Sequence, residues 1–328
     1  MPRLRLLALA AAAFVLAGCG SKQDALSPHS NAARGITSLW WHMLIGCALA
    51  FGILVAVLLM GFVRRRRPGV PGGVEADKAG WGAVLGLGIV IPILAISALF
   101  FFANIFLVRQ TSVPTANAAA ADRPTLAIHV VGHQFWWEVR YPGTRAVTAN
   151  EIHIPVRTNV VVTLHTDDVI HSFWVPQLNK KVDLLPEQVN NVLLYADKPG
   201  RYRGQCAEFC GLQHAHMGLY VFADPPAAFR RWLAAQAKPA TQTSSLFDDK
   251  CSSCHAIRGT PATSHVGPDL THVGSRTSLA ALTIPNTPAR LREWIQDPQR
   301  VKPGSSMPAV PLTSAQIASL VRYLEARK

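Results

Sequence analysis

The sequence predicts a membrane-anchored protein of several parts: two transmembrane helices, a β-sandwich or β-barrel, and a small all-α domain. Two uncharged apolar runs, residues 39–63 and 81–108, each exceed the roughly 20 residues that a helix needs to cross a bilayer. Residues 125–225 contain many short strand patterns separated by turn signals. Residues 241–328 instead show the apolar spacing of short helices. At 328 residues the chain is long enough for all of these parts.

The N-terminus has the features of a secretory signal peptide. Arg3 and Arg5 precede an apolar run that ends in small residues. The run closes with Leu-Ala-Gly-Cys, which resembles the cleavage box of bacterial lipoproteins. This resemblance implies that residues 1–18 are removed and that Cys19 becomes the lipidated first residue. The alternative is a plain N-terminal anchor in which Cys19 has no special role.

The charges between the two apolar runs predict the topology. Four consecutive arginines, residues 64–67, occupy the short connection, and such a loop stays in the cytoplasm. Everything after Val108 then lies on the outer, periplasmic face of a bacterial inner membrane. These arginines also supply the largest block of the net charge of +13. No basic stripe with interleaved aromatic residues remains, so the charge does not indicate nucleic-acid binding.

The outer part begins with a linker at residues 109–124, which are small and polar. Alternating and β-branched patterns then predict strands within residues 126–141, 151–156, 159–166, 189–200, 201–206 and 218–224. A helical stretch at 225–237 and a polar linker at 238–245 separate this β domain from the α domain at 241–328.

Two helices are predicted in the α domain. Thr313 and Gln316 have the spacing of a capping box. The residues behind them place one apolar face on the helix, formed by Ile317, Leu320, Val321 and Leu324. A second short helix starts at Asn286 or Thr287 and stops before Pro298.

Residues 251–255 read CSSCH, which is the attachment signature of a c-type haem. The thiols of Cys251 and Cys254 would form thioethers to the haem, and His255 would bind the iron. A thioredoxin-like C-x-x-C is the usual alternative, but it lacks the histidine and needs a βαβ setting. Haem is therefore the interpretation that the signature favours.

A second axial ligand is expected, and Met307 is the methionine of this domain that could supply it. His265 and His272 are competitors for the same role. The carbonyl of Pro268 is free to accept a hydrogen bond from Nδ1–H of His255 and so to fix the ring.

Three further segments identify a family for this domain. GPDLTHVGSR, PNTPARLREWIQDPQ and KPGSSMP resemble the cytochrome c domain fused to subunit II of the caa-type haem–copper oxidases. The resemblance implies a class I cytochrome c fold, covalent haem at Cys251 and Cys254, and axial ligation by His255 and Met307.

Residues 205–217 read QCAEFCGLQHAHM, and several sites could use them. Thiolate, thioether and imidazole groups suit copper. Thiolate and imidazole groups also suit zinc, so a zinc site is an alternative. Zinc has little use for Met217, which favours copper. A disulfide between Cys206 and Cys210 is the remaining alternative. The other cysteine in a long apolar run, Cys47, is expected to be inert packing.

Three motifs together resemble cytochrome c oxidase subunit II across residues 36–225. They are GHQFWW at 132–137, DVIHSFWVP at 168–176, and the copper-type segment at 205–217. The resemblance implies a cupredoxin-like β-barrel with a binuclear copper centre, CuA. Its copper ligands are then His171, Cys206, the backbone carbonyl of Glu208, Cys210, His214 and Met217.

The same resemblance assigns several neighbours. His216 falls off the ligand pattern, and His133 and His153 are expected to be hydrogen-bonded strand residues. The side chain of Glu208 would reach toward a magnesium ion shared with the catalytic subunit.

Some positions depart from the family pattern. The residue after GHQ, through which electrons enter in many relatives, is Phe135, followed by Trp136 and Trp137. The alternative role of all three is packing. The departure suits a tethered haem domain as the electron donor, since a tether raises effective concentration to roughly millimolar without a strong interface.

Two further departures concern single residues. Glu75 is the candidate for a glutamate near the second membrane helix that takes up protons in relatives, but it lies in a Gly/Pro-rich stretch. The family turn Lys-x-Asp-x-x-Pro-Gly is present as Lys181, Asp183 and Pro186, with Glu187 in place of the glycine.

The family resemblance implies an electron-accepting subunit of a terminal, proton-translocating cytochrome c oxidase. Electrons would pass from haem c to CuA and on to haem a and the oxygen-reducing site of subunit I. The expected partners are subunits I and III, membrane lipid, and a cytochrome c or cytochrome bc complex as donor. Three alternatives are a CuA-containing nitric oxide reductase-like complex, a quinol oxidase subunit, and a copper-carrying assembly lipoprotein.

Overall fold

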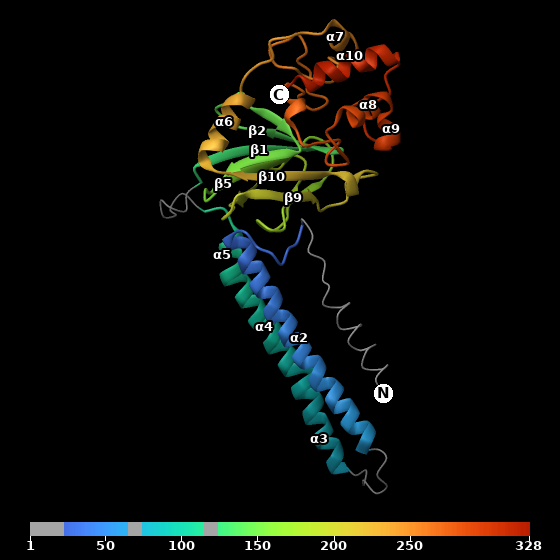
Figure 1. Ribbon diagram of the computed structural model, residues 1–328. Coiled ribbons are helices and arrows are strands. Elements are labelled where there is room, and N and C mark those ends of the chain that lie inside the picture. Colours follow the sequence, from blue (N-terminus) through green and yellow to red (C-terminus); the bar gives the residue numbers. More distant parts are fainter. Residues whose placement is uncertain (1–22, 65–73, 115–123) are drawn as a thin grey trace, which may run out of the picture. The chain divides into compact units, whose positions relative to one another are not determined.

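The computed structural model describes residues 23–64, 74–114 and 124–328, which form two compact units. One unit comprises residues 34–112, and the other comprises residues up to 33 together with residues from 113 onward. Figure 1 labels the elements of both. The predicted signal peptide, Cys19 and the arginines at 65–67 lie outside the described residues.

The first unit is a pair of long apolar helices. The first helix is α2 (Asn31–Arg64). The second is continuous but carries two π-helical turns; its segments are α3 (Val74–Leu85), η1 (Gly86–Val90), α4 (Ile91–Phe102), η2 (Ala103–Leu107) and α5 (Val108–Thr111). Among the described residues, Asn31–Arg64 and Gly80–Phe102 are long and apolar enough to cross a membrane. Most of their described leucine, isoleucine and phenylalanine side chains are exposed, which suits a lipid environment.

The ends of the second helix differ from the sequence-based expectation. Glu75 lies in the first turn of α3 rather than in a loop, and the helix continues through α5 into the stretch expected to be linker. A helix of this hydropathy propagates past its apolar centre because each added residue contributes one more backbone hydrogen bond.

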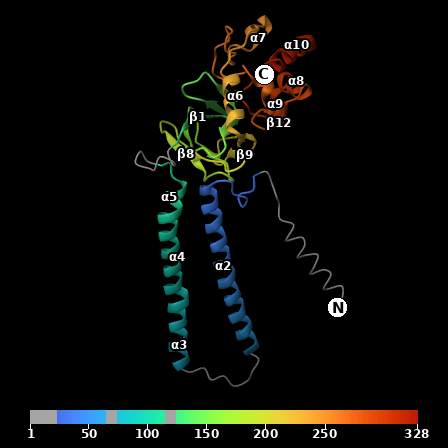
Figure 2. The ribbon, with the colours of Figure 1, turned by 60° about the vertical axis from the view of Figure 1, so that its left-hand side comes forward.

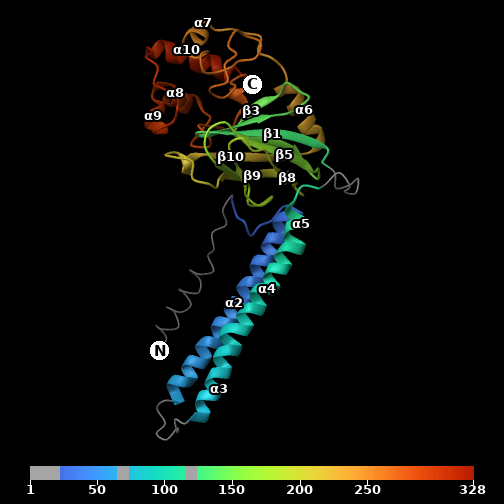
Figure 3. The same cartoon turned by 180° about the vertical axis from the view of Figure 1, so that it is seen from behind.

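The second unit contains a β-sandwich, which Figure 3 shows from behind. One five-stranded sheet has the order β3-β2-β1-β5-β8 and the other has the order β4-β10-β9-β6-β7. The strands of the first sheet are β1 (Leu126–His133), β2 (Trp136–Arg140), β3 (Val147–Ala149), β5 (Val160–Thr166) and β8 (Asn190–Leu194). Those of the second are β4 (Glu151–Pro155), β6 (His171–Trp174), β7 (Val182–Leu184), β9 (Gly200–Cys206) and β10 (Gly218–Asp224).

Alternating side chains from both sheets fill the core between them. In β5 every second residue is buried, from Val160 through Val162 and Leu164 to Thr166. The largest fully buried side chains of this core include Trp137, Tyr141, Phe173, Leu178 and Met217. The predicted β-barrel or sandwich is therefore confirmed, although β3, β6 and β7 were not predicted because three or four residues are too few to show an alternation.

One helix connects the β domain to the α domain. Helix α6 (Pro226–Gln236) packs on β4 and β10. Figure 2 shows α6 between the β domain and the α domain. Trp232 on α6 stacks on the ring of His153, with the ring centres 3.9 Å apart, and Phe229 is buried beneath it. This packing fixes the point from which the chain enters the α domain.

The α domain surrounds a core of its own. Its elements are α7 (Ser245–Lys250), η5 (Val273–Ser275), β11 (Ser278–Leu279), β12 (Ile284–Pro285), α8 (Pro288–Gln296), α9 (Pro298–Val301) and α10 (Ser314–Glu325). The predicted capping box is confirmed, since the side chains of Thr313 and Gln316 each accept from the other residue's backbone N–H. The apolar face of α10 is buried against Phe247, Leu291 and Ile295. Thr287 caps α8, as the sequence allowed.

Candidate metal centres

Two buried thiols face each other in the loop between β9 and β10. The sulfur atoms of Cys206 and Cys210 lie 3.9 Å apart, and the two residues are 2% and 4% exposed. A disulfide bond measures about 2.05 Å, so these thiols are free. The disulfide alternative therefore does not describe this structure.

The other predicted copper ligands surround these two sulfur atoms. Nδ1 of His171 lies 3.8 Å from the sulfur of Cys206, and the carbonyl oxygen of Glu208 lies 3.2 Å from it. Nδ1 of His214 and the thioether sulfur of Met217 lie 3.8 and 3.9 Å from the sulfur of Cys210. All six predicted donors thus lie in one cluster.

Three neighbouring strands of one sheet position these donors. His171 is the first residue of β6, Cys206 is the last of β9, and Met217 directly precedes β10. β6 pairs with β9 at Phe173 and Cys206, and β9 pairs with β10 along its length. The loop that carries the remaining donors is also held from the β1–β2 turn, because Nε2 of Gln134 donates to the carbonyl of Cys210 at 2.6 Å. The donors are consequently preorganised by backbone pairing.

Asp168 orients the ring of His171. Its carboxylate lies 2.9 Å from Nε2 of His171, which leaves Nδ1 facing Cys206. Burial alone would raise the pKa of Asp168, but hydrogen bonds from His171 and from the backbone N–H groups of Gln134 and Val169 outweigh it and lower the pKa to about 2. The carboxylate is thus ionised and ready to accept from the imidazole.

The thiol of Cys206 is shifted toward its thiolate form. Its pKa is lowered because Cys210 hydrogen-bonds to the sulfur; burial opposes this shift, and His171 and two backbone groups add to it. A buried set of thiolate, thioether and imidazole donors suits copper, whereas zinc sites in proteins use thiolate, imidazole and carboxylate ligands rather than a thioether. His171, Cys206 and Cys210 alone already form a group that could hold a metal ion.

Replacing Asp168 with alanine is expected to weaken copper binding by roughly 10- to 100-fold, the usual effect of removing the hydrogen-bond partner of a metal-binding histidine. The neighbouring Asp167 is the matched control, because its carboxylate is largely exposed and pairs with His165 instead. A competition titration of the purified protein with a copper chelator measures both variants. Equal copper affinity in the Asp168→Ala and Asp167→Ala proteins would contradict this role.

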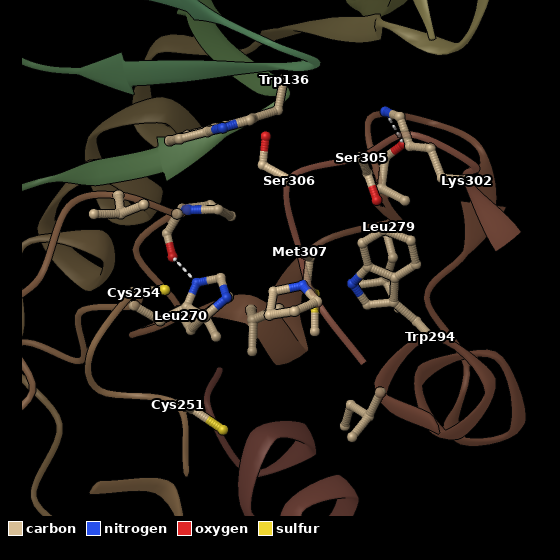
Figure 4. Close-up of a pocket in the computed structure, with 18 of the residues that line it drawn as sticks. Trp136, Cys251, Cys254, Leu270, Leu279, Trp294, Lys302, Ser305, Ser306 and Met307 are labelled. Carbon is tan, nitrogen blue, oxygen red and sulfur yellow. Dashed lines mark hydrogen bonds between the residues drawn. The ribbon is translucent and has the colours of Figure 1, made fainter. Parts of the chain in front are cut away.

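The second candidate site is a cavity of about 370 Å³ in the α domain. Cys251, Cys254, His255 and Met307 line it, together with an apolar wall of Leu270, Leu279, Leu291, Trp294, Ile295 and Leu320. Figure 4 shows Met307 near the middle of the cavity, between Leu270 and Trp294, with Trp136 at the end opposite Cys251. All four residues predicted to hold a haem therefore surround one largely apolar space.

The predicted contact of His255 is confirmed. Its Nδ1 lies 2.9 Å from the carbonyl oxygen of Pro268, so Nδ1–H donates there and Nε2 remains available to a metal. Gly267 is required beside it, because a Cβ atom at that position would lie 2.6 Å from Cε1 of the histidine ring.

Two buried polar atoms of the cavity wall suit the same ligand. Nε of Arg276 and the hydroxyl of Ser278 have no hydrogen-bond partner within the protein, although both residues line the cavity. A haem carries two carboxylates, which such donors can bind. The cavity thus offers thiols for covalent attachment of a haem, axial ligands for its iron and polar groups for its carboxylates.

The remaining histidines are not part of either donor set. Nδ1 of His216 lies 2.7 Å from the side-chain oxygen of Gln213, and His153 pairs with Asp224 at 2.7 Å. His133 stacks on Trp136 with ring centres 4.5 Å apart. His265 is exposed. Both ring nitrogens of the buried His272 face backbone carbonyls, at 2.9 and 3.0 Å.

The three aromatic residues after Gln134 have different surroundings. Trp136 is half-buried and lines the cavity of the α domain, as does Phe135. Trp137 is fully buried in the β core and donates from Nε1 to the carbonyl of Met217 at 3.3 Å. Only the first two can therefore contact a group bound in the cavity.

Sequence reasoning missed three residues. Gln134 and Asp168 lie inside the motifs GHQFWW and DVIHSFWVP. The partner of Gln134, Cys210, is 76 positions away, whereas Asp168 contacts His171 within the same motif, so that contact could have been found from the motif itself. Lys302 carried no signal. The structure also shows why the family turn has a glycine at position 187. Glu187, which replaces it, has φ of 63°, in the left-handed region that glycine favours.

Comparison with known proteins shows which families this chain resembles. Residues 144–223 match the family of the cytochrome c oxidase subunit II periplasmic domain, and residues 240–328 match the cytochrome c family. Cytochrome c oxidase subunit 2 of Alkalihalophilus pseudofirmus is 31% identical over 99% of this chain and 97% of its own length. The protein of the same name from Bacillus sp. PS3 is 29% identical over 80% of each chain. A solved periplasmic domain of subunit II from Bradyrhizobium japonicum is 28% identical, with a TM-score of 0.34 over 38% of this chain and 96% of that one.

Proposed function

Because the chain belongs to the cytochrome c oxidase subunit 2 family, we propose that it takes up electrons at a covalent haem c and passes them through a binuclear copper centre, CuA, to haem a in subunit I. The chain is an oxidoreductase subunit of a haem–copper oxidase with a fused cytochrome c domain. Reduction of oxygen would take place in subunit I. The observation that carries the proposal is the cluster of six donors, which includes two free thiols.

Six groups of the chain would hold the two copper ions. These groups would be the thiolates of Cys206 and Cys210, the imidazoles of His171 and His214, the thioether of Met217 and the backbone carbonyl of Glu208. A copper pair bound there would supply one-electron transfer. The protein's part is to keep the donors in place during this transfer. Pairing of β6, β9 and β10, together with the hydrogen bonds of Gln134 and Asp168, supplies that rigidity.

Four residues would hold the haem. Cys251 and Cys254 would attach it covalently, and His255 and Met307 would bind its iron. The Pro268 carbonyl fixes the orientation of His255. The apolar cavity wall excludes water, and a methionine ligand raises the reduction potential relative to a second histidine, which suits an electron carrier.

Trp136 and Phe135 would lie on the route from haem to copper. Both line the haem cavity, and they directly follow Gln134, whose side chain contacts the backbone of Cys210. Trp137 acts beside them by holding the carbonyl of Met217. This short connected path supports electron transfer between the two sites.

The remaining expectations extend the same proposal. The helix pair anchors the chain in a bacterial inner membrane, with both metal domains on the periplasmic face and a lipid on Cys19 after removal of residues 1–18. Subunits I and III are its partners, and a cytochrome c or cytochrome bc complex is the electron donor. The Glu208 side chain reaches a magnesium ion at the subunit I interface. Glu75 is the candidate for proton uptake.

Purified chain in detergent is expected to contain two copper ions for each covalently bound haem, since the described residues supply one complete donor set of each kind. Metal analysis gives the ratio, and absorption and EPR spectra identify the haem and the shared copper electron. A ratio of one copper per haem, or zinc in place of copper, would refute the binuclear assignment.

The alternative functions are not favoured by the relatives, which carry the name cytochrome c oxidase subunit 2. A quinol oxidase subunit would not need the copper donors that lie together here. Assay of the purified complex with oxygen and with nitric oxide distinguishes an oxidase from a nitric oxide reductase. Purification without a stoichiometric subunit I would instead favour a copper-carrying lipoprotein.

A further inference from the structure

Lys302 is a buried lysine at the boundary between the β domain and the α domain. It lies five positions before Met307 and is only 3% exposed. Its Nζ donates to the carbonyl oxygens of Phe135 at 2.8 Å, His216 at 2.8 Å and Ala280 at 3.0 Å. An ammonium group has three N–H donors, and all of them are accepted here.

These acceptors connect the two metal-binding regions. Phe135 precedes Trp136, and His216 precedes the copper donor Met217, so two acceptors come from the β domain. Ala280 and Lys302 itself come from the α domain. Because a buried ammonium is costly unless fully hydrogen-bonded, the contact requires all of these segments to be present at once. One side chain thereby joins the haem-bearing segment to the copper loop.

The acceptor segment Ala280–Leu282 is itself in an unfavourable conformation. Its three residues have φ of 52°, 55° and 66°, in the left-handed region that non-glycine residues avoid. The surrounding contacts hold it there: Ala280 accepts from Lys302, and the carbonyl of Ala281 accepts from the backbone N–H of Gly218 at 3.2 Å. Leu282 packs against the β core. A strained segment of this kind persists when the structure around it fixes its geometry.

Other directional contacts cross the same boundary. Nε2 of Gln213, within the copper loop, donates to the carbonyl of Pro303 at 2.7 Å. The backbone N–H and the hydroxyl of Thr277 both donate to the buried carboxylate of Glu151, at 2.7 and 2.6 Å. A tether can deliver electrons without a strong interface, and these hydrogen bonds add a specific docked arrangement to it.

We propose that Lys302 is a positioning residue that holds the haem domain in one orientation on the copper domain, so that electrons cross within a permanently docked pair. The proposal rests on the proposed function and adds to it the residue that sets the geometry of transfer. Lys302 is one of the residues that line the haem cavity, but its Nζ is bound to the backbone carbonyls of Phe135, His216 and Ala280, and it acts through these segments.

The test measures the rate of haem-to-copper electron transfer in the intact oxidase complex after photoreduction of the haem. Lys302→Met removes the three N–H donors and keeps the length of the side chain. The rate is expected to fall about tenfold or more. Each buried hydrogen bond of a charged group changes the equilibrium between the docked and the undocked domain by about a factor of ten or more. The rate should also become sensitive to solvent viscosity, because the domains must now find each other. Haem absorption and the copper EPR signal should stay unchanged.

Arg322→Met is the matched control, since it removes the same charge from an exposed position on α10. It is expected to leave both the rate and its viscosity dependence as in the parent protein. If Lys302→Met also behaves like the parent in both respects, the proposal is overturned.

A measurement on the unmodified complex covers the case in which Lys302→Met loses haem or copper. Brief treatment with an amine-labelling reagent, followed by mass spectrometry, compares Lys302 with the exposed Lys198. Docking predicts label on Lys198 and none on Lys302, whereas equal labelling overturns the proposal. Because labelling reads neither metal, its result is separate from a failure of the proposed function, which would show as missing haem or copper.

Discussion

Replacing Cys206 with serine is expected to abolish the copper centre and, with it, electron delivery to subunit I. The sulfur of Cys206 faces three other donors of the cluster: Cys210, His171 and the carbonyl of Glu208. A hydroxyl is a hard, weak ligand for copper at neutral pH, whereas a thiolate is a soft one. The loss of oxidase activity should therefore exceed the about 100-fold that removal of a ligand's hydrogen-bond partner can cause.

Copper content, the copper EPR signal and the rate of oxygen consumption measure this effect. Cys47→Ser is the control, because Cys47 is a free cysteine in α2, far along the sequence from every candidate donor. It should leave all three quantities unchanged, while haem content should be normal in both variants. A Cys206→Ser protein that retains two copper ions and full turnover would show that another group bridges the metals.

Met307→Ala is expected to keep the covalent haem but to lose the absorption band that arises from methionine bound to ferric iron. Cys251, Cys254 and His255 remain to attach the haem, so its content should not change. Without the thioether the reduction potential should fall by on the order of a tenth of a volt or more, within the about 0.8 V range that axial ligands span. Electron uptake should slow accordingly.

Optical spectra and a redox titration of the purified chain test this assignment. His265→Ala is the control, since His265 was the competing ligand and is exposed outside the cavity wall. Its spectrum should match that of the parent. If instead Met307→Ala preserves the band, or His265→Ala removes it, the axial ligand is not Met307.

Features that depend on neighbours in the sequence could be predicted. The haem signature places both thiols and His255 within five residues, and the capping box of Thr313 and Gln316 spans one helical turn. The copper segment similarly holds five of its six donors within residues 206–217. In such cases local spacing determines which side chains meet.

Features that depend on long-range pairing could not be predicted. The strands β6 and β7 are too short to show a pattern, and they exist because β9 and β8 lie beside them. Gln134 reaches Cys210 across 76 positions, and Lys302 reaches Phe135 across 167. No local property of a lysine in a Lys-Pro-Gly turn distinguishes a buried contact from an exposed charge. Only the assembled fold brings these groups together.

The position of Trp136 has a consequence for electron transfer from soluble donors. Its ring belongs to the wall of the haem cavity, so the α domain already occupies the face at which a free cytochrome would meet the copper domain. On the proposed function, a mobile donor would therefore deliver its electron to the haem domain rather than to the copper domain. The order of the two centres would then be set within one covalent chain, and the choice of external donor would depend on the surface of the α domain.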